Sequence, residues 1–147
     1  MKFNSQICTT REQSERLLAL GLKKETADMV WIPEVDFDAE GEPYDTGNYF
    51  ERPIKGVWDY TLLEGIPAWS LRLLIAMMPK CVMAHSIGDD SPRLHPYVPK
   101  FDYQGVTIEN IDEILADFYQ HTDLFDNIID AIEWLIKEKH FPKEYLV

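Results

Sequence analysis

The sequence has few cysteines, few glycines and no long apolar run. Two cysteines in 147 residues, Cys8 and Cys81, are too few for a disulfide framework. Seven glycines leave little material for a phosphate-binding loop, and neither a P-loop nor a G-x-G-x-x-G motif is present. The longest apolar stretch, around residues 71–78, is far shorter than the ~20 residues that span a bilayer. These absences argue against a disulfide-rich secreted domain, a nucleotide-binding loop and a membrane-spanning helix.

Positive charge is also scarce. Fourteen Lys and Arg stand against 26 Asp and Glu, which gives a net charge of -12 and an isoelectric point near 4.6. A surface with this balance repels phosphate groups, so direct nucleic-acid binding and binding to anionic membranes are disfavoured. The chain does contain 46% hydrophobic and 12% aromatic residues, enough apolar material for one core.

The first residues of the chain bear on its compartment. They read MKFNSQ and contain no apolar segment of the kind that a secretory signal needs before Thr9. Without export, both cysteines are expected to be reduced thiols. We therefore expect a cytoplasmic protein, and no motif in it calls for a cofactor.

A capping box predicts the first helix. Thr9 and Glu12 have the S/T-x-x-E spacing in which each side chain satisfies an unpaired backbone N–H group. Gly21 stands where a left-handed residue ends a helix. We expect a short strand over residues 30–32 next, stopped by Pro33.

Residues 33–55 have the composition of a long loop. Seven carboxylates precede the first basic residue, Arg52, and three prolines and two glycines are interspersed. Scattered aromatic side chains can hold such a loop against the body of a protein. We therefore predict an ordered but irregular acidic excursion, which can hold a hairpin through residues 56–60.

The remaining sequence predicts three helices and two strands. Ser70 suits the start of a helix within residues 66–78, which is apolar on nearly all sides and therefore expected at the centre of a core. Asn110 is a further helix-start signal, and Asp123 opens a last helix that ends near His140. The two strands are expected at residues 81–85 and 97–103.

The pattern as a whole predicts one α+β domain over residues 1–147. Several helices would pack on a small, mainly antiparallel sheet. The sequence contains no internal repeat and no low-complexity tract that would divide it further.

Three segments together resemble a known group of proteins. They are TTREQSERLL with TADM at residues 9–29, IPAWSL at residues 66–71, and AIEWLI at residues 131–136. The group is a family of small uncharacterised proteins of anaerobic gut bacteria and their prophages or mobile elements. The resemblance covers about half of the chain and brings no catalytic residues with it. It implies an accessory or interaction role rather than a housekeeping enzyme.

Two groups of side chains have the chemistry of metal or catalytic sites, and each is incomplete. Residues 36–41 (DFDAEG) begin like a calcium-binding EF-hand loop, but Gly47 stands where a bidentate glutamate is needed. Cys81 and His85 stand four apart, with His95 beyond, and a fourth zinc ligand is missing. A Cys–His nucleophile pair has no local signature. We therefore expect no metal site, a buried Cys81 thiol and a non-enzymatic protein.

Acidic and aromatic residues supply the candidate binding sites. From residue 101 to residue 136 there is no Lys or Arg, and Asp123 and Asp130 belong to the carboxylates expected to form one negative helix face. Trp134 falls off the apolar stripe of the last helix. A large aromatic residue there either packs under another element, such as the acidic excursion, or anchors an interface.

Three functions are open at this point. The one we favour is a protein-binding or accessory module whose acidic face or aromatic patch engages another protein or a second copy of the chain. An alternative is a small hydrolase or ligand-binding protein with a cleft between the 66–78 helix and the 33–55 loop, lined by Tyr44, Trp58 and Trp69. Another is an acidic mimic of nucleic acid that occupies a DNA- or RNA-binding protein.

Overall fold

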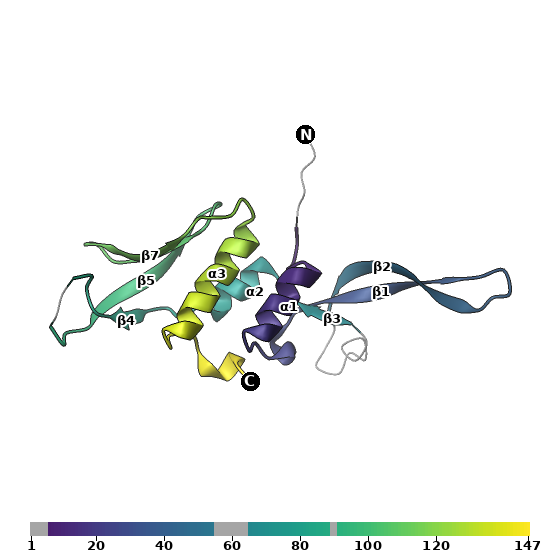
Figure 1. The fold of residues 1–147 in the computed structure, drawn as a ribbon, viewed down its shortest axis with the longest axis horizontal. Helices are drawn as coiled ribbons and strands as arrows, with labels where there is room; N and C mark the ends of the chain where they lie inside the picture. Colours follow the sequence, from purple (N-terminus) through teal and green to yellow (C-terminus); the bar gives the residue numbers. More distant parts are fainter. Residues whose placement is uncertain (1–5, 55–64, 89–90) are drawn as a thin grey trace. The chain divides into compact units, whose positions relative to one another are not determined.

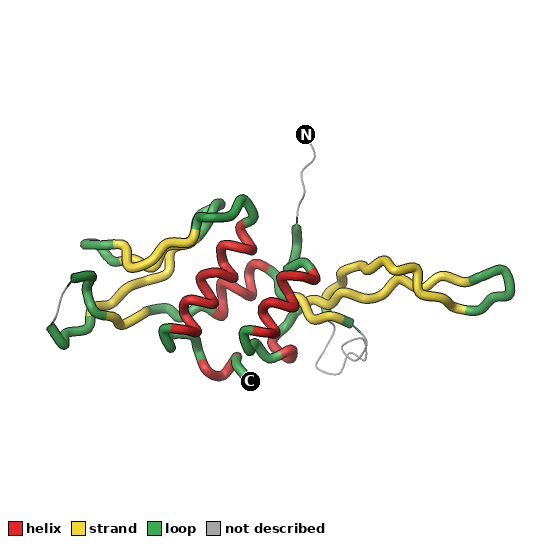
Figure 2. Tube along the Cα trace, in the orientation of Figure 1, coloured by secondary structure: helices red, strands yellow, loops and turns green. Residues whose placement is uncertain are grey.

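The computed structural model describes residues 6–54, 65–88 and 91–147. These residues form three α-helices and two antiparallel sheets, one of three strands and one of four (Figures 1 and 2). The predicted α+β class is confirmed, with two sheets in place of one. Residue contacts group the chain into two compact units, Met1–Leu73 with Val147 and Leu74–Leu146. That residues 1–147 form one domain stays a prediction.

Helix α1 (Arg11–Ala19) is fixed at both ends by its own sequence. The Thr10 hydroxyl accepts the Gln13 N–H at 3.2 Å, and the Gln13 side chain accepts the Thr10 N–H at 2.9 Å. The capping box therefore begins one residue later than predicted, because the Thr9 hydroxyl is used in the core instead. Gly21 ends the helix as predicted, with a left-handed φ of 106°. A short 3₁₀ turn, η1 (Lys24–Thr26), follows.

The three-stranded sheet has the order β2-β1-β3. Its strands are β1 (Met29–Phe37), β2 (Pro43–Pro53) and β3 (Ile66–Ala68). The prediction of an irregular excursion over residues 33–55 is therefore wrong, because most of that segment is the β1–β2 hairpin (Figure 1). The hairpin suggested at residues 56–60 lies outside the described residues. Beneath this sheet, Cys8, Met29 and Ala68 form a buried cluster.

Strand β1 continues past Pro33, and the reason is the direction in which the backbone groups of Pro33 point. The Asp38 N–H donates to the Glu42 carbonyl across the hairpin at 3.0 Å, so even-numbered residues of β1 direct their backbone groups toward β2. Odd-numbered residues, Pro33 included, direct theirs toward the opposite edge. The missing N–H of Pro33 is therefore not lost from the β1–β2 ladder.

Asp38 builds the turn of the hairpin. Its Oδ1 atom accepts the N–H groups of Glu40 and Glu42 at 3.0 and 2.9 Å. Gly41 supplies the left-handed conformation of the turn, with φ 79°. The segment that begins like an EF-hand loop is thus a hairpin turn, in which an aspartate binds its own backbone.

The four-stranded sheet has the order β4-β5-β6-β7. The predicted helix at Asn110 is wrong, because the Asn110 side chain accepts the N–H groups of Asp112 and Glu113, both at 2.9 Å, in a hairpin turn. Ile111, expected on an apolar helix face, is 97% exposed. The first two strands lie near the predicted positions. The four are β4 (Val82–Ala84), β5 (His95–Phe101), β6 (Val106–Glu109) and β7 (Ile114–Phe118).

Helix α2 (Leu71–Met77) is shorter than predicted, because Ile66–Ala68 pair with β1 as a strand. Ser70 caps it as expected, since its hydroxyl accepts the Leu73 N–H at 3.3 Å. Burial on all sides is not seen. The side chains of the helix that are fully buried lie on one face and are Leu74 and Met77.

Helix α3 (Leu124–Lys137) begins where the sequence predicts. Asp123 is its N-cap, and the Asp123 carboxylate accepts the Phe125 N–H at 2.9 Å. The helix packs on β6 and β7, and a 3₁₀ turn, η3 (Lys143–Tyr145), follows it. Its apolar stripe forms the core of this unit through Phe125, Ile128, Ile129, Ile132 and Leu135. No helix in the described ranges is long and apolar enough to cross a membrane.

Candidate functional site

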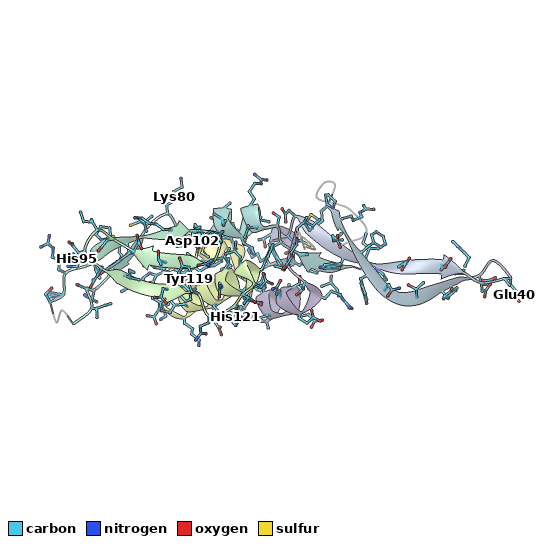
Figure 3. The ribbon with its side chains drawn as sticks, turned by 90° about the horizontal axis from the view of Figure 1, so that it is seen from above. Glu40, Lys80, His95, Asp102, Tyr119 and His121 are labelled. Carbon is cyan, nitrogen blue, oxygen red and sulfur yellow. The ribbon has the colours of Figure 1, made fainter. Side chains whose placement is uncertain are left out.

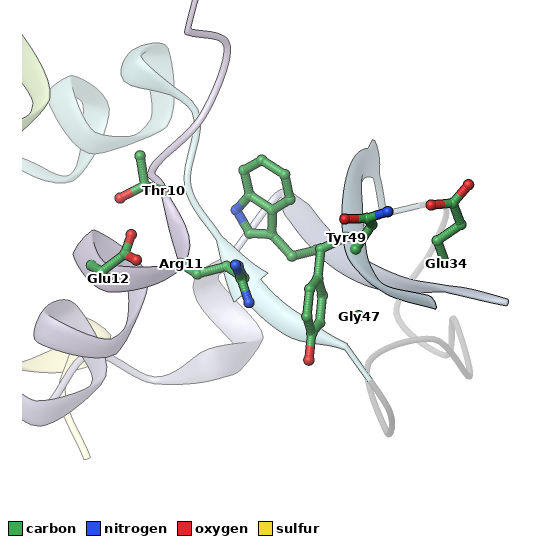
Figure 4. Close-up of a pocket in the computed structure, with 8 residues that line it drawn as sticks. Thr10, Arg11, Glu12, Glu34, Gly47 and Tyr49 are labelled. Carbon is green, nitrogen blue, oxygen red and sulfur yellow. The ribbon is translucent and has the colours of Figure 1, made fainter. Parts of the chain in front are cut away.

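A groove of about 450 Å³ lies where the β1–β2 hairpin meets the N-terminus of α1 (Figure 4). All of it belongs to the first unit. Its walls come from the first turn of α1, from β1 and from the middle of β2. The lining residues are Thr10, Arg11, Glu12, Trp31, Glu34, Gly47, Asn48 and Tyr49.

Arg11 and two aromatic side chains hold the base of the hairpin against α1. The Arg11 guanidinium lies 4.3 Å from the centroid of the Tyr49 ring, a cation–π contact (Figure 4). The Trp31 indole N–H donates to the Thr9 carbonyl at 2.8 Å. With Glu12 beside them, these groups offer aromatic surface and charges of both signs to a polar group in the groove.

A bulge in β2 shapes the far wall of the groove. Three residues of β2, 46–48, oppose Glu34 alone. The Thr46 hydroxyl donates to the Glu34 backbone carbonyl at 3.2 Å and to its carboxylate at 3.1 Å. Gly47 adopts a left-handed φ of 81°. The bulge therefore also interrupts the outer edge of β2.

Beyond the groove, β1 alternates between apolar and acidic residues, reading PEVDFD over residues 33–38. Val35 and Phe37 lie on the same face as Trp31 and are 53% and 65% exposed. Glu34 and Asp36 lie on the opposite face. This part of the strand thus has one apolar face and one negative face, both in contact with solvent.

The hairpin arm, residues 33–51, is negative throughout. The sequence contains no Lys, Arg or His from residue 25 to residue 51. Glu40 lies at the tip of the hairpin (Figure 3). Cationic groups are therefore attracted along the whole arm. Its carboxylates are Glu34, Asp36, Asp38, Glu40, Glu42, Asp45 and Glu51.

The residues predicted to line a cleft do not form one in the described structure. Trp69 is fully buried, and its indole N–H donates to the Thr26 hydroxyl at 2.9 Å. Tyr44 lies opposite Asp36 on the hairpin arm and is 48% exposed. Trp58 lies outside the described residues. The sequence contains a signal for one wall of the groove, because Trp31 stands in the strand pattern of residues 30–32, but it contains none for the groove itself.

Trp134 contacts aromatic neighbours within its own unit. Its ring lies 6.1 Å, between centroids, from both Phe118 on β7 and His140 after α3. Of the two acidic candidates, Asp123 caps α3, and the Asp130 carboxylate lies 2.9 Å from Nε2 of His121. In the structure, these three residues therefore serve local contacts of the second unit.

The acidic run from residue 101 onward does not form one helix face, because residues 110–118 are a turn and a strand. Asp102 accepts the Gly105 N–H at 2.9 Å in the β5–β6 turn and the Tyr119 hydroxyl at 2.9 Å (Figure 3). Glu113 accepts the Tyr97 hydroxyl. That hydrogen bond lowers the pKa of Glu113 and raises the pKa of Tyr97. Asp102 thus stabilises a turn, and Glu113 binds a side chain of β5.

The cysteines and histidines lie apart. Cys81 is exposed, so the prediction of a buried thiol there is wrong, whereas Cys8 is 2% exposed. Cys81 directly precedes the short edge strand β4, which leaves it uncovered. Nδ1 of the exposed His85 lies 3.2 Å from the Arg93 carbonyl oxygen. Among the residues that the structure describes, no three His, Cys, Asp or Glu side chains are placed to hold a metal ion.

We expect the two thiols to react with an aromatic disulfide reagent at very different rates. Burial, with the nearby carboxylates of Glu51 and Asp28, raises the pKa of the Cys8 thiol from 9.0 to about 11. The reactive thiolate of Cys8 is therefore scarce at pH 8 as well as shielded. The Cys81→Ser variant, which keeps only Cys8, should react roughly 100-fold more slowly than Cys8→Ser. Equal rates in the folded variants would contradict the burial of Cys8.

Comparisons with known proteins add no relative. The chain matches no protein-family model, no curated protein and no solved structure. The family resemblance of the three segments at residues 9–29, 66–71 and 131–136 therefore stays a prediction.

Proposed function

We propose that this protein is a non-enzymatic binding module whose hairpin arm engages a basic protein partner in the cytoplasm. The observation that carries the proposal is the hairpin arm itself. Seven carboxylates, with no basic residue among them, surround exposed apolar side chains on a hairpin that extends well beyond β3 (Figures 1 and 3).

The apolar side chains support binding because several of them are exposed on one short hairpin, on both of its faces. Single exposed apolar residues are ordinary on a protein surface, but several on one hairpin indicate an interaction site. Carboxylates steer a cationic partner toward the hairpin, and burial of its exposed apolar groups then gives affinity. The exposed apolar members of the arm are Val35, Phe37, Tyr44 and Phe50.

The charge of the arm decides which class of partner fits. Nucleic acid would be repelled by the seven carboxylates. Two copies of the chain would bring two such sets together, which disfavours association through the arm. A protein surface rich in Lys and Arg is attracted, and salt should weaken that attraction because the charges are exposed.

The proposal is tested by reversing charge on the arm while keeping the side chains that build its turn and its bulge, those of Asp38, Gly41, Thr46 and Gly47. Glu40, Glu42 and Glu51 are suited to this because they are exposed. A variant with lysine at all three should lose the basic proteins that the tagged wild type captures from host lysate at about 50 mM salt, as measured by quantitative mass spectrometry. In this variant three negative charges of the arm are replaced by three positive ones, so the arm no longer steers a cationic partner toward itself.

The matched control places lysine at three exposed glutamates outside the arm, Glu15, Glu25 and Glu144. It has the same net charge as the arm variant and should still capture the same basic proteins. If both variants lose them equally, net charge and not the arm determines binding, and the proposal fails. Capture that is unchanged in both variants would exclude it as well.

A further inference from the structure

We infer that the partner docks as an extended strand on the free edge of β1, and that this strand alternates apolar and basic residues. The inference rests on the proposed function and adds to it the place and the sequence pattern of recognition.

Among the residues that the structure describes, none pairs with the edge of β1 that faces away from β2 beyond Trp31. Strand β3 pairs only with Met29, Val30 and Trp31, and no other strand of the described chain joins β1 on that side. By the alternation that places Pro33 at this edge, Val35 directs its N–H and C=O groups there and Phe37 directs its C=O group there. The Phe37 N–H already donates to the Asp36 carboxylate at 2.8 Å, so the docked strand must displace this contact to pair with it. An added strand satisfies such groups by continuing the ladder.

The side chains of β1 specify what the added strand must carry. Residues directly opposite each other in neighbouring strands project to the same face. The partner residues opposite Val35 and Phe37 therefore meet apolar side chains, whereas the residues between them meet Glu34 and Asp36. The complement of this pattern is a strand in which apolar residues alternate with Lys or Arg.

The same features exclude a second copy of β1 as the occupant. Pairing two β1 edges places Glu34 and Asp36 of one copy against carboxylates of the other, and like charges opposite each other are destabilising.

The position of the docked strand is limited by Pro33 and by the bulge in β2. Pro33 lacks an N–H group on the free edge of β1, which confines a new ladder to the outer part of the strand. The outer edge of β2 is a poorer template because the bulge at residues 46–48 interrupts it.

Three fluorescein-labelled peptides test the pattern by fluorescence anisotropy. They are KVKVKVK, KSKSKSK, which has the same charge without apolar residues, and EVEVEVE, which has the opposite charge. We expect the first to bind at least about 10-fold more tightly than the second, and the third not to bind. Equal binding of the two basic peptides would mean that charge alone is recognised, which overturns strand docking but leaves the proposed function standing. If neither basic peptide binds, strand docking is overturned, and the arm-reversal capture experiment decides separately on the proposed function.

Two matched variants test whether the peptide docks on β1. Phe37→Ser removes an exposed aromatic side chain from the apolar face of β1, and Tyr44→Ser removes one from the other face, on β2. We expect Phe37→Ser to weaken binding of KVKVKVK at least about 5-fold and Tyr44→Ser to change it less than about twofold. Equal losses in the two folded variants would overturn the assignment to β1.

Backbone pairing is tested with two modified forms of KVKVKVK, N-methylated on every valine or on every lysine. A strand directs alternate N–H groups to opposite edges, so only one of these sets can face β1. One form should lose at least about 10-fold in affinity while the other binds within about threefold of the parent peptide. An equal effect of the two modifications, or no effect of either, would exclude a strand on this edge.

Discussion

Replacing Trp69 with alanine is expected to lower the free energy of unfolding by about 3–5 kcal/mol, the usual range for removal of a large buried aromatic side chain. Trp69 is fully buried, and its indole N–H is bonded to Thr26. Its backbone N–H donates to the Thr9 hydroxyl at 3.1 Å, and its carbonyl accepts the Thr9 N–H at 2.9 Å. The loss is measured by urea denaturation followed by far-UV circular dichroism.

A Trp69→Phe variant supplies the graded comparison, because the alanine variant loses an amount close to the whole stability of a small domain. Phenylalanine keeps most of the buried apolar area and removes the indole hydrogen bond to Thr26. We expect it to cost about 1–2 kcal/mol. An alanine variant as stable as the wild type would show that Trp69 is not a core residue, and would return it to the list of candidate binding residues.

The burial of Trp69 shows why the sequence alone misplaces it. Locally, IPAWSL has the proline and serine of a helix start, so its tryptophan reads as a side chain at the rim of a cleft. The structure buries it because Ile66–Ala68 pair with β1, more than thirty residues earlier in the chain. Pairing between distant strands leaves no trace in the spacing of neighbouring residues.

Signals that act within one turn of chain are the ones that sequence reading recovers. Gly21 and Asp123 mark the end of α1 and the start of α3, because each makes its contacts within a few residues. Asn110 misleads for the same reason. An asparagine that accepts N–H groups two and three residues ahead serves equally as a helix cap or as a hairpin turn, and only tertiary context decides between them.

The hairpin arm depends both on local signals and on contacts between distant segments. Its alternation of apolar and acidic residues, PEVDFD, is a strand pattern, but its proline and its carboxylates are also typical of loops. The sequence predicts correctly that this segment is acidic. It cannot predict the groove, because the contact between Arg11 and Tyr49 depends on the register of the hairpin against α1.

The second large effect on stability is expected for substitution of Asn127. It is a fully buried polar residue on α3. Its amide donates to the Gln104 carbonyl at 2.7 Å and to the His121 carbonyl at 2.9 Å, and its side-chain oxygen accepts the His121 N–H at 2.9 Å. One side chain therefore satisfies three backbone groups, two of them in the segment that leads from β7 to α3 and one in the β5–β6 turn.

Asn127→Asp keeps the shape of this side chain and removes its two donors. A carboxylate would then face two carbonyl oxygens in a buried site, and we expect a loss of about 3 kcal/mol at pH 7. Those surroundings raise the pKa of the new aspartate in the folded state above its unfolded value of about 3.9. Stability is thus penalised most above the folded pKa, and the penalty shrinks as the pH falls through it, because a protonated carboxyl group can donate again.

The measurement is urea denaturation of Asn127→Asp and wild type at pH 7 and at about pH 4, near the unfolded pKa. The gap between the two proteins should narrow at the lower pH. The reverse exchange on the same helix, Asp130→Asn, is the control, because the pair that Asp130 forms with His121 is partly exposed and the exchange should cost less than about 1 kcal/mol. If the gap for Asn127→Asp is the same at both pH values, the missing donors are not what destabilises the variant, and the role assigned to the Asn127 amide is wrong.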